Sequence, residues 1–256
     1  MKYKVLLFCI ILFQSTGYSQ IIGNPVGTKG TKKWSVSVNG TYMVQDYLHN
    51  TRTSSRRLLI KSEWGITPWL DFYALGGGYD LKLDFEKQGF TDFKSKMKFC
   101  YGAGLDAALQ PKSDLPLRIW TGAQIFLGPA EGDYFEHISF AGTSIIKKYR
   151  LEYNWMESKG FLGLIYYGKL FKLYIAVAGW LLQNTSTIDE YSQSGTSWNL
   201  EASREGEDSS GIWTGGIIGL EFDLPSNYAL TFECLAFNEQ DFQLMVGFSQ
   251  TGTPGW

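Results

Sequence analysis

The chain has 256 residues, a length that suits one large β domain, and 44% of them are hydrophobic. The 17 Phe, 15 Tyr and 9 Trp form a high aromatic content, which favours strands and membrane interfaces. The formal net charge is −2, and the sequence contains no basic patch interleaved with aromatic residues, so composition gives no indication of nucleic-acid binding.

The first segment, Met1–Gln20, has the parts of a secretory signal. Two lysines give it a positive start, and Val5–Phe13 form an apolar core of about nine residues, fewer than the roughly 20 that a membrane-spanning helix needs. Small residues end the segment, and we predict cleavage after Ser19. The sequence therefore predicts a signal peptide over residues 1–19 and a single domain over residues 20–256.

Behind this segment, polar and apolar residues alternate along most of the chain. The stretch Arg57–Asp84 shows the pattern most clearly: its first arm alternates residues such as Leu58 with residues such as Lys61, and its second arm alternates Leu81 with Lys82. Successive side chains of a strand point to opposite faces. Alternation of this length therefore places one face against an apolar medium and the other against a polar one.

We predict ten strands in chain order and connections that alternate between short and long. The strands cover residues 33–47, 55–67, 69–83, 95–110, 116–128, 146–168, 171–183, 210–223, 226–238 and 239–250. The short connections fall near residues 65–69, 110–116, 168–171 and 224–227, and the long ones near residues 47–55, 84–94, 129–145 and 183–209. Short periplasmic turns and longer outer loops are typical of outer-membrane barrels. The sequence therefore predicts an all-β, transmembrane up-and-down antiparallel β-barrel of about ten strands (ten to twelve).

A soluble secreted β-sandwich that binds a ligand is the alternative fold, because alternation alone does not say which face is covered by protein. Two features favour the membrane. The predicted strands of about 12 residues exceed the five or six that are typical of soluble sheets. Aromatic residues also gather at both strand ends, with Trp64 and Trp69 near a short turn and Trp155 and Trp180 towards the long loops.

One predicted strand, 146–168, fits this scheme badly. It places Glu157 and Lys159 in line with Trp155 and Phe161. A charge that faces lipid at the middle of the bilayer costs about 2–4 kcal/mol. Since about ten residues of a tilted strand cross the apolar band, we expect Glu157 and Lys159 to lie at or above the outer interface; a β-bulge there is the alternative.

The turn Trp64–Asp71, with the sequence WGITPWLD, resembles the G-[ILV]-T-x-x-[LFW]-[DE] periplasmic turns of small porin-like outer-membrane barrels. The resemblance implies a barrel in the outer membrane of a two-membrane bacterium, with outer-membrane lipid, lipopolysaccharide and the barrel-assembly machinery as partners, and it implies no cofactor. Family members end on an aromatic residue that the assembly machinery reads. Trp256 is aromatic, but it stands beyond Pro254 and does not close the last strand at Phe248.

An enzymatic alternative depends on His137 and Ser139. This pair is similar to the His-x-Ser-Asn element of outer-membrane lipid A deacylases, although Phe140 stands in place of the Asn that would help to hold the oxyanion. Glu152 is the candidate that would orient His137. The only other histidine is His49, and two lone histidines do not make a metal site. We expect a non-enzymatic protein and keep the lipid A acyl hydrolase as the alternative.

Charged residues on the polar face would line the lumen. In a ten-stranded barrel, only slightly wider than the eight-stranded kind that side chains fill, we expect them to pair across the interior. The expected role is a narrow passive channel for small solutes or a structural and surface-interaction barrel. The lumen candidates are Arg57, Lys61, Glu63, Asp80, Lys82, Lys96, Lys98, Asp106, Arg118, Glu221, Glu233 and Asp241.

Overall fold

The computed structural model describes residues 33–47, 51–85, 89–110, 116–140, 143–194, 197–209, 213–236 and 241–252. The predicted signal peptide and Trp256 lie outside these residues. The described elements are β1 (Trp34–Tyr47), β2 (Thr51–Thr67), β3 (Leu70–Phe85), β4 (Phe93–Lys94), β5 (Lys98–Leu109), β6 (Leu117–Phe140), β7 (Thr143–Tyr167), β8 (Phe171–Ser194), β9 (Ser197–Ser209), β10 (Trp213–Leu224), the 3₁₀ turn η1 (Pro225–Asn227), β11 (Tyr228–Ala236) and β12 (Phe242–Gly252).

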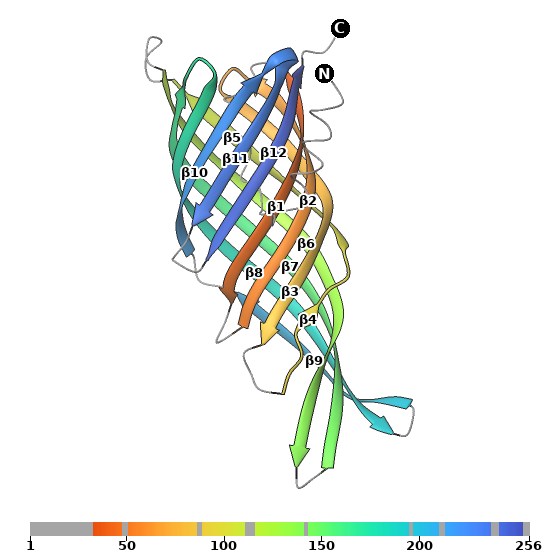
Figure 1. Cartoon of the computed structure of the whole chain (residues 1–256). Helices are drawn as coiled ribbons and strands as arrows, with labels where there is room; N and C mark the ends of the chain where they lie inside the picture. Colours follow the sequence, from red (N-terminus) through yellow and green to blue (C-terminus); the bar gives the residue numbers. More distant parts are fainter. Residues whose placement is uncertain are drawn as a thin grey trace.

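Ten of the described strands form one closed antiparallel ring (Figure 1). Their order is β1, β2, β3, β5, β6, β7, β8, β10, β11 and β12, and β12 pairs with β1 to close the ring. The closing seam runs from Trp34 opposite Gly252 to Val44 opposite Phe242. The prediction of an all-β, up-and-down antiparallel barrel of about ten strands is confirmed.

The two remaining strands lie outside the ring. Strand β4 pairs with β3 through Lys82 and Leu83. Strand β9 pairs with β8 over Gln183–Ser194, whereas β10 pairs with the same edge of β8 over Phe171–Trp180. Strands β9 and β10 therefore follow one another along β8. The short connection between β7 and β8, residues 168–170, and the turn η1 between β10 and β11 lie at one end of the barrel, which we name the short-turn end.

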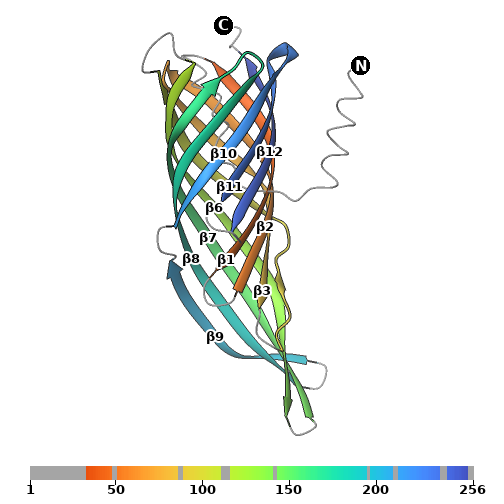
Figure 2. The same cartoon turned by 60° about the vertical axis from the view of Figure 1, so that its left-hand side comes forward.

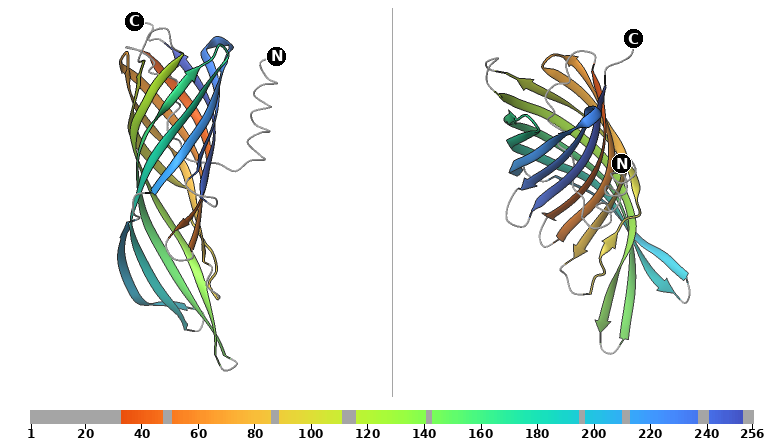
Figure 3. Two further views of the ribbon diagram at one scale, coloured as in Figure 1. Left: turned by 90° about the vertical axis from the view of Figure 1, so that its left-hand side faces the viewer. Right: turned by 45° about the horizontal axis from the view of Figure 1, so that its top comes forward.

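Strands β6 to β9 run far beyond the other strands at the opposite end (Figures 2 and 3). We name this part, residues 129–140, 143–154, 184–194 and 197–209, the outer extension. The prediction of long loops at 129–145 and 183–209 was therefore wrong, because most of these residues are paired in two long hairpins. On β8 beyond Gln183, polar residues such as Thr185, Ser186 and Asp189 occupy both faces, so the two-residue alternation of polarity that marks a membrane strand is missing there.

The two faces of the barrel wall differ in character. Large apolar side chains are exposed on the outside, with Leu58 at 52%, Leu162 at 61% and Val177 at 66% exposure, as a surface that meets lipid requires. On the inner face, polar residues such as Asn39 and Gln243 are buried. Hydrocarbon, and not a second protein layer, is the medium that fits such an exterior.

Some inward glycines leave room for large rings. A Cβ atom at Gly104 would lie 2.3 Å from the ring of Tyr73, and one at Gly219 would lie 2.0 Å from the ring of Tyr174. Each glycine is the cross-strand partner of its tyrosine. The tyrosine rings can therefore lie flat over the neighbouring strand and fill the interior.

The interior holds two apolar clusters of buried side chains. The smaller one surrounds Trp120 and Tyr174, and the larger one extends from Tyr73 to the aromatic residues Tyr134 and Tyr149 of the outer extension. No helix within the described part of the chain is long and apolar enough to cross a membrane.

Candidate functional site

Charged side chains form layers across the lumen, and the layer nearer the outer mouth, the upper layer, ties opposite walls together. Arg57 on β2 forms an ion pair of 2.6 Å with Glu157 on β7. Lys159, two residues further along β7, lies 3.4 Å from the second oxygen of Glu157 and donates a 3.3 Å hydrogen bond to Gln243 on β12. A single carboxylate therefore serves two cations in the middle of the barrel.

Aromatic rings enclose the guanidinium of Arg57. Its central carbon lies 4.5 Å from the ring centre of Phe126, 5.8 Å from that of Tyr79 and 5.6 Å from that of Trp155. Arg57 is 2% exposed and Glu157 is 1% exposed. Since the attraction between opposite charges is strongest where water is excluded, this ion pair fixes the position of both side chains.

A second ionic layer lies nearer the short-turn end. The Lys61 ammonium is 3.4 Å from a carboxylate oxygen of Glu63 and 3.4 Å from one of Asp106, and it sits 3.9 Å above the ring of Tyr73. The hydroxyl of Ser35 donates a 3.0 Å hydrogen bond to Glu63. The layer joins strands β1, β2, β3 and β5.

A third group of charges lines the mouth at the short-turn end. Lys172 pairs with Glu221 at 2.7 Å and with Asp223 at 2.9 Å. The guanidinium of Arg118 lies 4.5 Å from the ring centre of Tyr167. Slightly deeper, the Tyr174 hydroxyl donates a 2.9 Å hydrogen bond to Glu233.

The outer mouth is filled by aromatic rings. The rings of Tyr134 and Tyr149 stack with centres 5.0 Å apart, and Phe85 and Phe90 pack against Tyr134. The Tyr149 hydroxyl donates a 2.7 Å hydrogen bond to Glu136. Burial raises the pKa of the Tyr134 phenol to about 12 and, with the neighbouring carboxylate of Glu136, raises the pKa of Tyr149 above its ordinary value.

The structure places most of the predicted lumen residues in the interior, but not all of them. Arg57, Lys61, Glu63, Asp106, Glu221, Glu233 and Asp241 are buried, and Arg118 is half-buried at the short-turn mouth.

Four of the predicted lumen residues do not line the sealed interior. Asp80 and Lys82 lie on the face of β3 opposite to the buried Tyr79 and Leu81, so their assignment to the lumen was wrong. Lys96 is exposed, and Lys98 is half-exposed and forms a 2.8 Å ion pair with Glu131. On β3 the inward positions near the outer mouth are occupied by Tyr79, Leu81 and Leu83, so Asp80 and Lys82 between them face outwards.

On β7, Glu157 and Lys159 face the lumen, as do Trp155 and Phe161, so the expectation that this row of side chains faces lipid was wrong. The predicted conflict with lipid does not arise, because the whole row points inwards. Opposite charges two residues apart on one strand were the signal for this interior ionic layer.

The candidate catalytic residues do not form a triad. His137 pairs in register with Ile146, Ser139 pairs with Ser144, and Glu152 pairs with Glu131. Ile146 and Glu152 are six residues apart on β7, about 20 Å at the rise of a strand, so Glu152 cannot orient His137. Glu152 instead forms an ion pair with Arg150. Among the described residues, no group of three or more His, Cys, Asp or Glu side chains could hold a metal ion.

A closed antiparallel ring with an apolar exterior and a charged interior is the architecture of an outer-membrane β-barrel. Solved structures of outer-membrane proteins are similar to this chain at low sequence identity. The outer-membrane protease OmpT from Escherichia coli is 10% identical, with a TM-score of 0.43 over 86% of this chain and 94% of that one. The translocator domain of the autotransporter NalP from Neisseria meningitidis is 7% identical, with a TM-score of 0.46 over 88% of each chain. The outer membrane protein OprG from Pseudomonas aeruginosa is 12% identical, with a TM-score of 0.39 over 88% of this chain and 99% of that one. No family model and no curated protein matches the sequence.

Proposed function

We propose that the protein is a non-enzymatic barrel of the bacterial outer membrane whose lumen is closed to solutes and whose working surface is the outer extension. Export through a cleaved signal peptide, insertion by the barrel-assembly machinery and contact with lipopolysaccharide are parts of this proposal. They are supported by the composition of Met1–Gln20 and by the apolar exterior of the ring.

The observation that carries the proposal is the filled lumen. From the short-turn end outwards, the interior contains the Lys172 group, the Lys61 layer, the Arg57 layer and the aromatic rings around Tyr134. Lys61, Trp120, Phe126 and Trp180 are each at most 1% exposed, so water reaches almost none of their surface. A passive channel needs a wetted path past these side chains. The packing therefore favours the structural and surface-interaction role over the passive channel.

The outer extension supports the second half of the proposal. Its backbone is held by long runs of antiparallel pairs, from Pro129 opposite Asn154 to Phe140 opposite Thr143, and from Gln183 opposite Ser209 to Ser194 opposite Ser197. Ordered strands of this length present a fixed surface to the outside. Loops that only connect barrel strands normally have few backbone hydrogen bonds.

The test is ion conductance of the refolded full chain in planar lipid bilayers. We expect no stepwise current from the wild-type protein. A variant that removes the centre of the upper layer, Arg57→Ala with Phe126→Ala, is expected to pass a small ion leak because it removes two large buried side chains from the interior and leaves a cavity. Leu58→Ala, which removes a side chain from the lipid face of the same strand, is the matched control and is expected to remain closed.

Heat-dependent migration in a detergent gel shows whether each variant is folded. Stepwise wild-type current, or entry of small sugars into liposomes that contain the wild-type protein, would contradict the closed lumen and restore the passive channel.

A further inference from the structure

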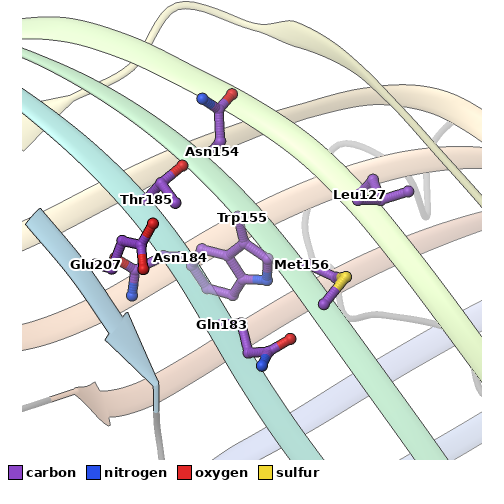
Figure 4. Close-up of a pocket in the computed structure, with 8 residues that line it drawn as sticks. All are labelled: Leu127, Asn154, Trp155, Met156, Gln183, Asn184, Thr185 and Glu207. Carbon is purple, nitrogen blue, oxygen red and sulfur yellow. The ribbon is translucent and has the colours of Figure 1, made fainter.

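The outside of the barrel wall has a pocket of about 580 Å³ over β6, β7, β8 and β9 (Figure 4). Its volume lies within the range of about 300–1,000 Å³ that is usual for sites of small ligands. Six of its lining residues share the outward face of the sheet, as the cross-strand register requires: Leu127, Asn154, Met156, Gln183, Thr185 and Glu207.

The pocket lies at the upper edge of the lipid-facing surface. An apolar band of about 25 Å spans about ten residues of a strand tilted by about 40°. On β6, ten residues separate Leu117 at the short-turn end from Leu127, and on β7 ten residues separate Tyr166 from Met156. Both counts end at Leu127 and Met156, the apolar lining residues that we name the floor of the pocket.

The polar side of the pocket begins beside the apolar residues and continues one step further out. Gln183 is the cross-strand partner of Met156, and Asn154 and Thr185, which are partners of one another, are the next outward-facing residues of β7 and β8. Asn154, Gln183 and Thr185 are all exposed. The pocket therefore joins an apolar floor at the depth of lipid tails to amides and a hydroxyl at the depth of lipid headgroups.

The side chains select among lipid headgroups. Amides and a hydroxyl donate and accept hydrogen bonds, which matches the hydroxyl groups of a sugar. The carboxylate of Glu207 accepts hydrogen bonds from hydroxyls and repels a phosphate. None of the eight lining residues is a cation. The nearest outward cations on β7 are Arg150, which pairs with Glu131, and Lys148, which pairs with Asp133 at 2.8 Å.

We propose that this pocket binds the sugar headgroup of a glycolipid of the outer leaflet, with the lipid chains lying against Leu127 and Met156. The apolar floor is continuous with the lipid-facing surface, so a membrane lipid is the molecule that reaches the pocket without leaving its own layer. The site lies on the outside of the wall and acts whether or not the lumen conducts.

The test compares two lipids with identical chains and different headgroups. Native mass spectrometry of the full chain in detergent measures binding of diglucosyl diacylglycerol, an uncharged glycolipid, and of phosphatidylglycerol. We expect the glycolipid to bind more tightly. The double variant Asn154→Leu with Gln183→Leu is expected to weaken glycolipid binding about tenfold, because two hydrogen-bonding amides are lost, and to leave phosphatidylglycerol binding unchanged.

Two controls match the variants in chemistry and exposure. Asn199→Leu removes an exposed amide from β9 outside the pocket and is expected to change nothing. Glu207→Gln removes the carboxylate and is expected to raise binding of phosphatidylglycerol, whereas Glu205→Gln, two residues away on β9, is not. All variants are first checked for the folded form by heat-dependent gel migration. Equal binding of both lipids by the wild-type protein, or a double variant that binds glycolipid as the wild type does, would overturn the proposal.

Discussion

At the scale of single residues, Glu157 has the most demanding position, since it is buried and serves both Arg57 and Lys159. Removal of one partner from a buried ion pair leaves an uncompensated charge and costs about 3–5 kcal/mol. We predict that Glu157→Leu lowers the free energy of unfolding more than Arg57→Met does. The first change removes the carboxylate that both Arg57 and Lys159 contact, whereas the second leaves the ion pair between Glu157 and Lys159 in place. Urea unfolding in lipid vesicles, followed by tryptophan fluorescence, measures the difference.

The control at this scale is Glu131, which also serves two cations, Lys98 and Arg150, but lies outside the membrane and is accessible to water. Both cations lower the pKa of the Glu131 carboxyl. Because solvent screens this network, Glu131→Gln is expected to change the stability very little. An equal loss in Glu131→Gln and Glu157→Leu would refute the role that we assign to burial.

At the scale of elements, the ring closes through the pairing of β8 with β10, and β9 adds nothing to that closure. We predict that replacing the hairpin tip from Asp189 to Ser203, which are cross-strand partners, by a two-residue turn leaves the barrel able to fold. Circular dichroism and the heat-dependent gel shift are the measurements. A shortened protein that fails to fold would show that the outer extension takes part in folding the barrel.

The aromatic filling of the outer mouth gives a second prediction at this scale. The pKa of Tyr134 is raised to about 12 and that of Tyr149 is also raised, so the folded state holds these protons more tightly than the unfolded state. Their contribution to stability is therefore complete below the ordinary tyrosine pKa of about 10 and is lost as the pH rises towards the folded values. An alkaline titration of phenolate absorbance should show late-titrating groups, fewer in Tyr134→Phe. Titration of every tyrosine near pH 10 would contradict this.

At the scale of the whole molecule, the sequence pattern predicts the closed ring of strands but not which side chains fill its lumen. Alternation identified Arg57 and Lys61 as inward because the opposite face of their strand is mostly apolar, with Leu58, Ile60 and Trp64. It misassigned Asp80 and Glu157, because in β3 and β7 the lumen also contains large rings, and apolar residues then occur on both faces. Residues 129–145 and 183–209 are predicted as loops for a related reason: beyond the membrane, both faces of a sheet can be polar. Which apolar face of a strand meets lipid depends on the neighbouring strands, so the sequence of that strand alone does not predict it.

The closing seam between β1 and β12 has a consequence for biogenesis. It joins positions 34 and 252, near opposite ends of the chain, so the bonds that complete the cylinder connect the most distant parts of the polypeptide. Until the final strand arrives, β1 presents a row of unsatisfied amide and carbonyl groups that could capture any extended peptide. Because the entropy of closing so long a loop must be paid before these contacts form, the closure of the ring is expected to be a late step of folding.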